Sequence, residues 1–183
     1  NDTATTEIYT LSLHDALPIL EAINARQRRL VADKVEAWCG LAGLAPADLT
    51  VAVWGLAFKP GTDDVREAPA LDTVRRLLAL GARVQAHDPQ AMANAAAALG
   101  PQPHLAFIDD ALSACAGADI LCLLTEWRCF RRPDFARLAG LLRRRTIFDG
   151  RNQYEWQRLR VHGLTVFGVG TGHPWPATAM APA

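Results

Sequence analysis

Three cations follow two apolar runs of this sequence, and their chemistry suits a phosphorylated ligand. Lys59 and Arg66 come after the run at residues 50–54, and Arg151 comes after the run at 146–148. A planar guanidinium can bind a phosphate or a sugar hydroxyl through two donors, whereas a lysine ammonium acts as a point charge. Lys59 and Arg151 follow their runs closely and have no obvious local role. These two residues are therefore the first candidates for contact with a ligand.

The carboxylates near these cations have simpler structural explanations. Asp63 and Asp64 are expected to order their own loop through bonds from side chain to backbone. Glu67 is expected to face the positive end of the helix that follows it. Three further aspartates are expected to cap helices, namely Asp88, Asp109 and Asp110. The indole of Trp127 is expected to cover the edge of the sheet.

The elements that must position these side chains alternate between strand and helix patterns. Short apolar runs predict strands at 50–54, 83–87, 104–108, 119–124, 146–148 and 164–167. Apolar residues at helical spacing, with capping residues at the ends, predict helices at 20–43, at 69–80, after 88–89, after 109–110, at 134–142 and at 153–161. This alternation predicts an α/β fold, with a Rossmann-like open, mainly parallel sheet, helices on both faces and a long preceding helix. Ligands of such sheets bind beyond the carboxyl ends of the strands, so the three cations should gather along one edge.

Composition narrows the classes of partner and compartment. The formal net charge is zero, which gives no whole-chain argument for binding nucleic acid or an anionic membrane. The four cysteines form no Cys-x-x-Cys pair and no zinc-type spacing, so we expect no metal and a reduced, cytoplasmic setting. We expect no membrane span, because no apolar stretch approaches the roughly 20 residues that a spanning helix needs. The N-terminal residues lack the pattern of a signal peptide.

The turn after the first predicted strand lacks the signature of a dinucleotide site. Such a site normally shows Gly-x-Gly-x-x-Gly, but residues 55–59 read GLAFK, with a lysine where a bare backbone would have to approach a pyrophosphate. The glycines at 168 and 170 have no predicted helix behind them. We therefore expect a Rossmann-like sheet that does not bind a whole NAD by itself.

Three segments, in order along the chain, resemble the UDP-glucose/GDP-mannose dehydrogenase family. They read GLAFKPGTDDVREAP at 55–69, TEW at 125–127 with Phe130 and Asp134, and FDGRN at 148–152. The segment NARQ at 24–27 also resembles the family's helix that joins two domains and forms a dimer contact. The second and third segments resemble the branch that oxidises UDP-glucose. The branches that oxidise UDP-N-acetylmannosamine or GDP-mannose are the alternatives.

The resemblance implies a role for each matching residue. Phe58, Lys59 and Arg151 match positions that contact the UDP-sugar, and Arg66 matches an arginine that contacts NAD across the domain cleft. The family oxidises a primary alcohol twice with two NAD, through a covalent intermediate on a cysteine. That cysteine lies in a glycine-rich segment N-terminal to the matching residues, and none of the four cysteines has such a setting. The resemblance therefore implies a fragment without a catalytic residue, inactive without the N-terminal NAD-binding domain.

The chain divides into four expected segments. Residues 1–19 resemble a translated sequencing adaptor and are excluded from the fold, although a genuine disordered arm is the alternative. Residues 20–43 form the connecting helix, residues 49–170 the Rossmann-like domain that binds the UDP-sugar, and residues 171–183 a disordered tail.

The connecting helix is also expected to mediate homodimerisation. Its apolar face carries Ile23, Leu30 and Trp38, and an exposed apolar face needs a partner. A non-catalytic nucleotide-binding or assembly module is the alternative to an enzyme fragment. The DNA upstream of Leu20 would separate the two, because an enzyme needs a glycine-rich strand–helix start and a glycine-flanked cysteine there.

Overall fold

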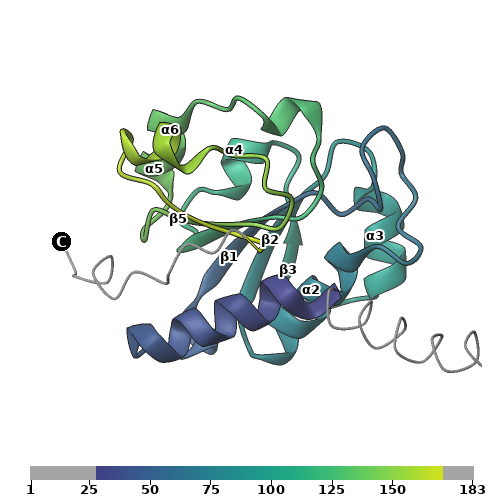
Figure 1. The fold of residues 1–183 in the computed structure, drawn as a ribbon. Coiled ribbons are helices and arrows are strands. Elements are labelled where there is room, and N and C mark those ends of the chain that lie inside the picture. Colours follow the sequence, from purple (N-terminus) through teal and green to yellow (C-terminus); the bar gives the residue numbers. More distant parts are fainter. Residues whose placement is uncertain (1–27, 171–183) are drawn as a thin grey trace, which may run out of the picture.

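The computed structural model describes residues 28–170, and its centre is a sheet of six parallel strands (Figure 1). The strands are β1 (Thr50–Trp54), β2 (Arg83–His87), β3 (Leu105–Phe107), β4 (Ile120–Leu123), β5 (Thr146–Asp149) and β6 (Thr165–Gly168). Their spatial order is β3-β2-β1-β4-β5-β6. The order reverses between β1 and β4, which makes their carboxyl ends the expected place for a ligand. All six predicted strands are confirmed.

Helices cover both faces of the sheet, as predicted. An N-terminal helix occupies residues 28–42 and is followed by η1 (Pro46–Asp48), α2 (Pro69–Ala79), α3 (Met92–Leu99), α4 (Ala111–Ala114), η2 (Arg128–Phe130), α5 (Phe135–Leu141) and α6 (Trp156–Arg160). Figure 1 shows the N-terminal helix and α2 on one side of the strands, with α4, α5 and α6 on the other. This arrangement follows from right-handed crossovers that run outward from β1 and β4 in opposite directions.

Burial explains why the central strands read as continuous apolar runs. Every residue of β4 and β5 is buried, because both faces of the sheet are covered. On α2, Leu71, Val74 and Leu77 form the buried stripe, at the spacing that the sequence predicted. Asp110 caps α4 and Asp134 caps α5 by accepting from backbone N–H groups three residues ahead.

The N-terminal helix packs its apolar face on its own sheet, and this corrects one prediction. Trp38 is only 6% exposed and packs edge-on against Phe148 of β5, with ring centroids 5.9 Å apart. Val35 and Cys39 are buried beside it. Trp38 as a dimer contact is therefore wrong, because the sheet already covers this face. Leu30 is half-buried, and Ile23 lies outside the described residues.

One predicted helix boundary changes, and three predicted ranges lie outside the described residues. Helix α6 begins at Trp156 rather than at residue 153, because the backbone N–H groups of Arg151 and Tyr154 turn back to the carboxylate of Asp149. The predicted segments 1–19 and 171–183, and residues 20–27 of the connecting helix, lie outside the described residues.

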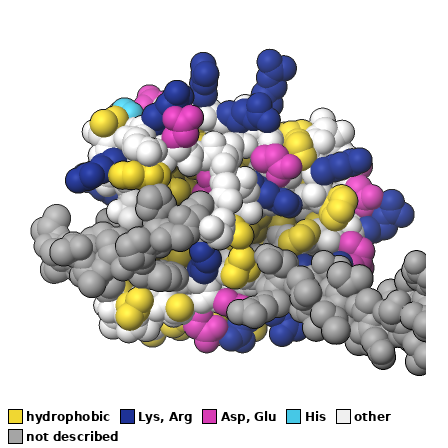
Figure 2. Space-filling model, in the orientation of Figure 1, with side chains coloured by type: hydrophobic (Ala, Val, Ile, Leu, Met, Phe, Trp, Pro, Cys, Tyr) yellow, Lys and Arg dark blue, Asp and Glu magenta, His cyan; other side chains and the backbone are white. Residues whose placement is uncertain are grey.

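Charges are mixed on the surface. Figure 2 shows basic and acidic side chains interleaved over the described part of the visible face. None of the described helices is long and apolar enough to cross a membrane. Within residues 28–170, no group of three or more His, Cys, Asp or Glu side chains is placed to hold a metal ion.

Candidate functional site

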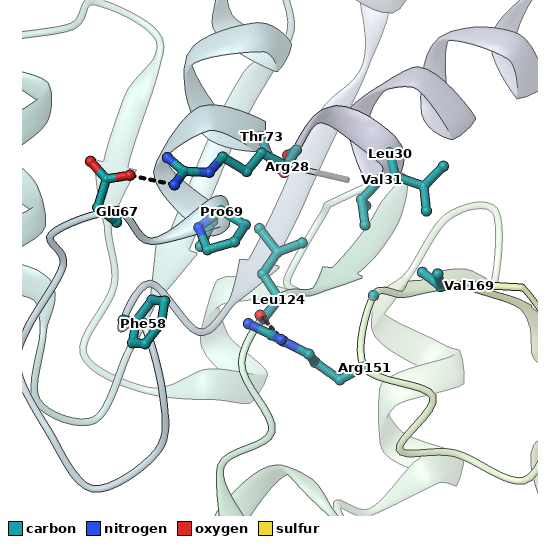
Figure 3. Close-up of a pocket in the computed structure, with 12 residues that line it drawn as sticks. Arg28, Leu30, Val31, Phe58, Glu67, Pro69, Thr73, Leu124, Arg151 and Val169 are labelled. Carbon is teal, nitrogen blue, oxygen red and sulfur yellow. Dashed lines mark hydrogen bonds and ion pairs between the residues drawn. The ribbon is translucent and has the colours of Figure 1, made fainter. Parts of the chain in front are cut away.

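A cavity of about 420 Å³ lies where the sheet topology predicts a ligand site. Its walls come from the N-terminal helix, the loop after β1, the start of α2 and the segments after β4, β5 and β6. The lining residues are Arg28, Leu30, Val31, Phe58, Glu67, Pro69, Ala70, Thr73, Leu124, Gly150, Arg151 and Val169. Figure 3 shows Phe58 and Arg151 on opposite sides of this space, below Arg28 and Pro69. Two of the four predicted site residues, Phe58 and Arg151, therefore line one cavity.

Arg151 is held in place by its own strand end and by its neighbour. Its backbone N–H donates to Asp149 Oδ1 at 3.0 Å, and its Nε donates to the carbonyl of Leu124 at 2.7 Å. Glu126 Oε2 lies 3.2 Å from the same Nε, and this buried oxygen has no hydrogen bond among the described residues. Arg151 therefore has partners within the protein that the sequence did not reveal. These contacts use Nε, so both terminal nitrogens of the guanidinium remain to donate to an anion.

The loop after β1 presents Phe58 and Lys59. The N–H of Phe58 donates to Asp64 O at 2.8 Å, which closes the loop, and the ring is 49% exposed. Lys59 is exposed beside it but does not line the cavity.

Arg66 is held by its own loop and does not line the cavity. Its Nε and Nη2 donate to the two oxygens of Asp64 at 2.9 and 2.8 Å, while 87% of the side chain stays exposed. This bidentate contact lowers the pKa of Asp64 from 3.8 to about 2. Asp64 Oδ1 also accepts from the backbone of Arg66, so the prediction that Asp64 orders this loop is confirmed. Asp63 bonds instead to Asn94 of α3.

The buried carboxylate of Asp88 fixes the β1 loop, a role that the sequence did not reveal. Oδ1 accepts from the N–H groups of residues 90 and 91, in the turn before α3, at 2.9 and 2.8 Å. Asp88 was expected to cap that helix, but this prediction is wrong, because the capping position of α3 is Ala91 and no side chain bonds there. Oδ2 accepts from Leu56 N, Ala57 N and the indole of Trp127, at 2.7, 3.1 and 3.0 Å. The buried indole of Trp127 thus helps to position the segment before Phe58.

The described residues do not fit a complete NAD. In a dinucleotide site an acidic side chain after the second strand binds the ribose, but the Asp88 carboxylate is fully buried and occupied by protein donors. Gly55 adopts φ +92°, and a Cβ there would lie 2.5 Å from Cβ of Thr125. The lack of a side chain at Gly55 therefore lets two loops of the protein pack closely, and it does not make room for a pyrophosphate. No step of a reaction can be assigned to NAD on these residues.

The cavity also contains an ion pair that sequence reasoning missed. Arg28 Nη2 of the N-terminal helix donates to Glu67 Oε2, and Nη1 lies 3.8 Å from Asp72 Oδ2. Glu67 was expected to act on the helix that follows it, but its carboxylate contacts a helix 39 residues earlier. Only the fold brings these segments together, so no local pattern could have revealed this pair.

None of the four cysteines has the setting of a nucleophile. Cys39, Cys115 and Cys122 are buried and Cys129 is exposed, and all four are free. Burial raises the pKa of every one of these thiols, that of Cys39 to about 11. A catalytic cysteine needs the opposite shift, toward the thiolate.

Comparison with known proteins agrees with this geometry. The model of the UDP-glucose/GDP-mannose dehydrogenase family, UDP binding domain, matches residues 52–156. The UDP-glucose 6-dehydrogenase of Pseudomonas aeruginosa is 43% identical over 163 residues, covering 84% of this chain and 34% of that protein. The UDP-glucose 6-dehydrogenase TuaD of Bacillus subtilis is 35% identical over 155 residues, covering 83% and 32%. The chain thus spans about a third of the length of the curated relatives it matches.

Solved structures show the same relationship. The UDP-D-ManNAc dehydrogenase of Pyrococcus horikoshii superimposes with a TM-score of 0.68 at 26% identity, covering 84% of this chain and 33% of that one. The UDP-glucose dehydrogenase of Pyrobaculum islandicum gives 0.62 at 31% identity, covering 76% and 28%. The chain therefore belongs to the UDP-glucose/GDP-mannose dehydrogenase family, and its matched part is that family's UDP binding domain.

Proposed function

We propose that this chain supplies the UDP-sugar-binding part of an NAD-dependent UDP-glucose 6-dehydrogenase. In this proposal Phe58, Lys59 and Arg151 contact the sugar nucleotide, and Arg66 contacts NAD. Several relatives at 31–43% identity carry the name UDP-glucose 6-dehydrogenase, which supports the choice of sugar.

The observation that carries the proposal is the position of Arg151 in the cavity. Its guanidinium is fixed through Nε, and Phe58 provides an apolar surface across the same space (Figure 3). A pre-oriented guanidinium can bind a diphosphate through paired donors with little loss of side-chain freedom. The exposed Lys59 adds a second positive charge beside Phe58. Such a wall binds the nucleotide and orients the sugar.

The chemistry in this proposal lies outside the described residues. NAD, when bound, would accept the hydride from the sugar alcohol, and among the described residues Arg66 alone is proposed to reach it. Because the four thiols have raised pKa values, we also propose that this chain alone does not turn over substrate. We also propose a cytoplasmic location, with which the four free cysteines are consistent.

Calorimetric titration of the 183-residue chain with UDP, UDP-glucose and GDP tests the binding role. We expect UDP and UDP-glucose to bind, and the variants Lys59→Ala and Arg151→Ala to lose about 1.5–3 kcal/mol each, the value of a charge-assisted hydrogen bond. Arg160→Ala is the matched control, because this exposed arginine of α6 does not line the cavity. Equal affinity of all four proteins for UDP would refute the site, and preference for GDP would refute the nucleotide.

UDP-N-acetylmannosamine is the second candidate substrate. The structure of the Pyrococcus horikoshii enzyme, named as a UDP-D-ManNAc dehydrogenase, superimposes at least as well as the UDP-glucose dehydrogenase structure. NADH formation by the complete gene product, with a panel of UDP- and GDP-sugars, separates the candidates. Oxidation of UDP-glucose alone is the expected result.

We also propose that the complete protein forms a homodimer, with fewer contact residues than the sequence predicted. Trp38 is buried in the core, so the contact would have to use other residues of the connecting helix. Sedimentation of the complete gene product measures this directly, and a monomer would contradict it.

A further inference from the structure

Two arginines line the cavity, and each is paired with a carboxylate of the protein. Arg151 lies 3.2 Å from Glu126, and Arg28 donates to Glu67. The proposed function assigns Arg151 to the ligand but leaves Arg28 without a role. Arg28 precedes the residues 52–156 that match the model of the UDP binding domain.

The partner of Arg28 is held in an unfavourable backbone conformation. Glu67 adopts φ +57°, a region that a non-glycine residue occupies only at some cost. Its side chain is nevertheless 74% exposed, while that of Arg28 is 33% exposed. Strained backbone beside a cavity is a feature of ligand-binding segments. Here it places a carboxylate next to the cation that the N-terminal helix brings to the cavity (Figure 3).

We infer that Arg28 is a further ligand-binding residue, which exchanges Glu67 for an anionic group of the sugar nucleotide, and that Glu67 competes with the ligand. This inference rests on the proposed function, since it takes the cavity to be the site of the nucleotide.

The exchange is physically favourable because the two contacts differ in strength. An ion pair with a carboxylate as exposed as that of Glu67 contributes little, so its release costs little. A phosphate carries more charge and, inside the cavity, sits nearer to low-dielectric walls, where a charge-assisted bond is stronger. Arg28 and Arg151 would then hold the anion from two sides.

The backbone of Arg28 does not have to move for this exchange. The hydroxyl of Thr73 on α2 donates to Arg28 O at 3.4 Å, a weak link between the two helices. Val31, a few residues further along, packs within the core. With the backbone anchored in this way, the exchange would proceed by rotation about the side-chain bonds of Arg28.

UDP affinities of four variants of the full chain test the inference. Arg28→Gln should weaken binding about tenfold, as expected for the loss of one charge-assisted hydrogen bond. Glu67→Gln should strengthen binding about twofold, because it frees Arg28 and keeps a side chain that tolerates the same backbone. The double variant should bind like Arg28→Gln alone, since Glu67 acts only through Arg28. Arg29→Gln is the matched control, because this exposed neighbour does not line the cavity.

The outcomes separate this inference from the proposed function. If the ion pair only joins the two helices, Arg28→Gln and Glu67→Gln will both lower Tm, and neither will change UDP affinity; that result overturns the inference. If Arg151→Ala weakens UDP binding but Arg28→Gln does not, only the inference fails. If the wild-type chain binds no UDP at all, the proposed function fails and this inference fails with it. Weaker UDP binding by Arg28→Gln together with stronger UDP binding by Glu67→Gln would support the exchange.

Discussion

Replacement of Asp88 by asparagine should both destabilise the fold and weaken UDP binding. The Asp88 carboxylate is fully buried and accepts five hydrogen bonds, two through Oδ1 and three through Oδ2. An amide nitrogen put in place of either oxygen would face two or three N–H donors. Since a bond to a charged group contributes about 1.5–3 kcal/mol, loss of two such bonds should cost about 4 kcal/mol of unfolding free energy.

The loss of binding follows from the loss of charge on the remaining oxygen. With the amide nitrogen on the side of the two Oδ1 donors, the neutral amide oxygen still faces Leu56 N and Ala57 N but accepts from them more weakly. These two residues directly precede Phe58 and Lys59, so both proposed ligand contacts should become less well positioned. Urea unfolding followed by circular dichroism measures the stability, and calorimetry with UDP at low temperature measures the affinity. If Asp88→Asn does not fold, Thr125→Val removes a weaker link to the same loop, the bond from Thr125 Oγ1 to Ala57 O at 2.7 Å.

Asp119→Asn is the matched control for this experiment. Asp119 is also buried and accepts from Thr50 N at 2.9 Å, but it lies at the amino end of β4, away from the cavity. This variant should lose stability and keep its UDP affinity. The reasoning is refuted if Asp88→Asn costs less than about 1 kcal/mol. It is also refuted if Asp88→Asn leaves UDP affinity unchanged while Arg151→Ala lowers it.

Three further predictions concern other parts of the structure. Trp38→Ala should cost about 3–5 kcal/mol of unfolding free energy, because it leaves a void against Phe148, and it should not change the sedimentation of the chain. Cys129 should be the one thiol that a bulky disulfide reagent modifies quickly in the folded chain, since the other three are buried; fast loss of a second thiol would contradict this. Arg66→Ala should return the pKa of Asp64 from about 2 toward 3.8 in an NMR titration. Because the pKa of Asp64 is lowered in the folded protein, its contact with Arg66 is fully present above pH 3.8 and is lost as the pH falls through about 2. If the pKa of Asp64 does not change in Arg66→Ala, Arg66 is not the cause of the lowered pKa.

Much of the fold could be predicted because its causes are local. The strands β1 and β4 are apolar on both faces, and only a sheet covered on both sides needs such runs. Asp110 and Asp134 cap their helices through bonds to residues three positions away, so a short window of sequence contains the whole interaction. The placement of Phe58 and Arg151 at one cavity also follows from local causes, because parallel strands bring their carboxyl ends to one edge.

The interactions that the sequence could not predict join segments that are far apart along the chain. The apolar face of the N-terminal helix is visible in the sequence, but its partner is not: periodicity shows that Trp38 needs cover and cannot distinguish a second copy from Phe148. Arg151 and Leu124 likewise meet only because β4 and β5 are neighbours in the sheet.

The sequence by itself therefore determined the order of strands and helices along the chain, the family and the edge of the sheet that carries the proposed site, since all of these depend on periodicity, caps and short motifs. Only the tertiary structure decided which partners those side chains have. The fold brings the Asp88 carboxylate into hydrogen bonds with the loop after β1, and it brings Arg28 next to Glu67. It also places Lys59 and Arg66 outside the cavity. The physical reason is that hydrogen bonds and ion pairs act over a few ångströms, and residues tens of positions apart come within that range only when the sheet and its helices have packed.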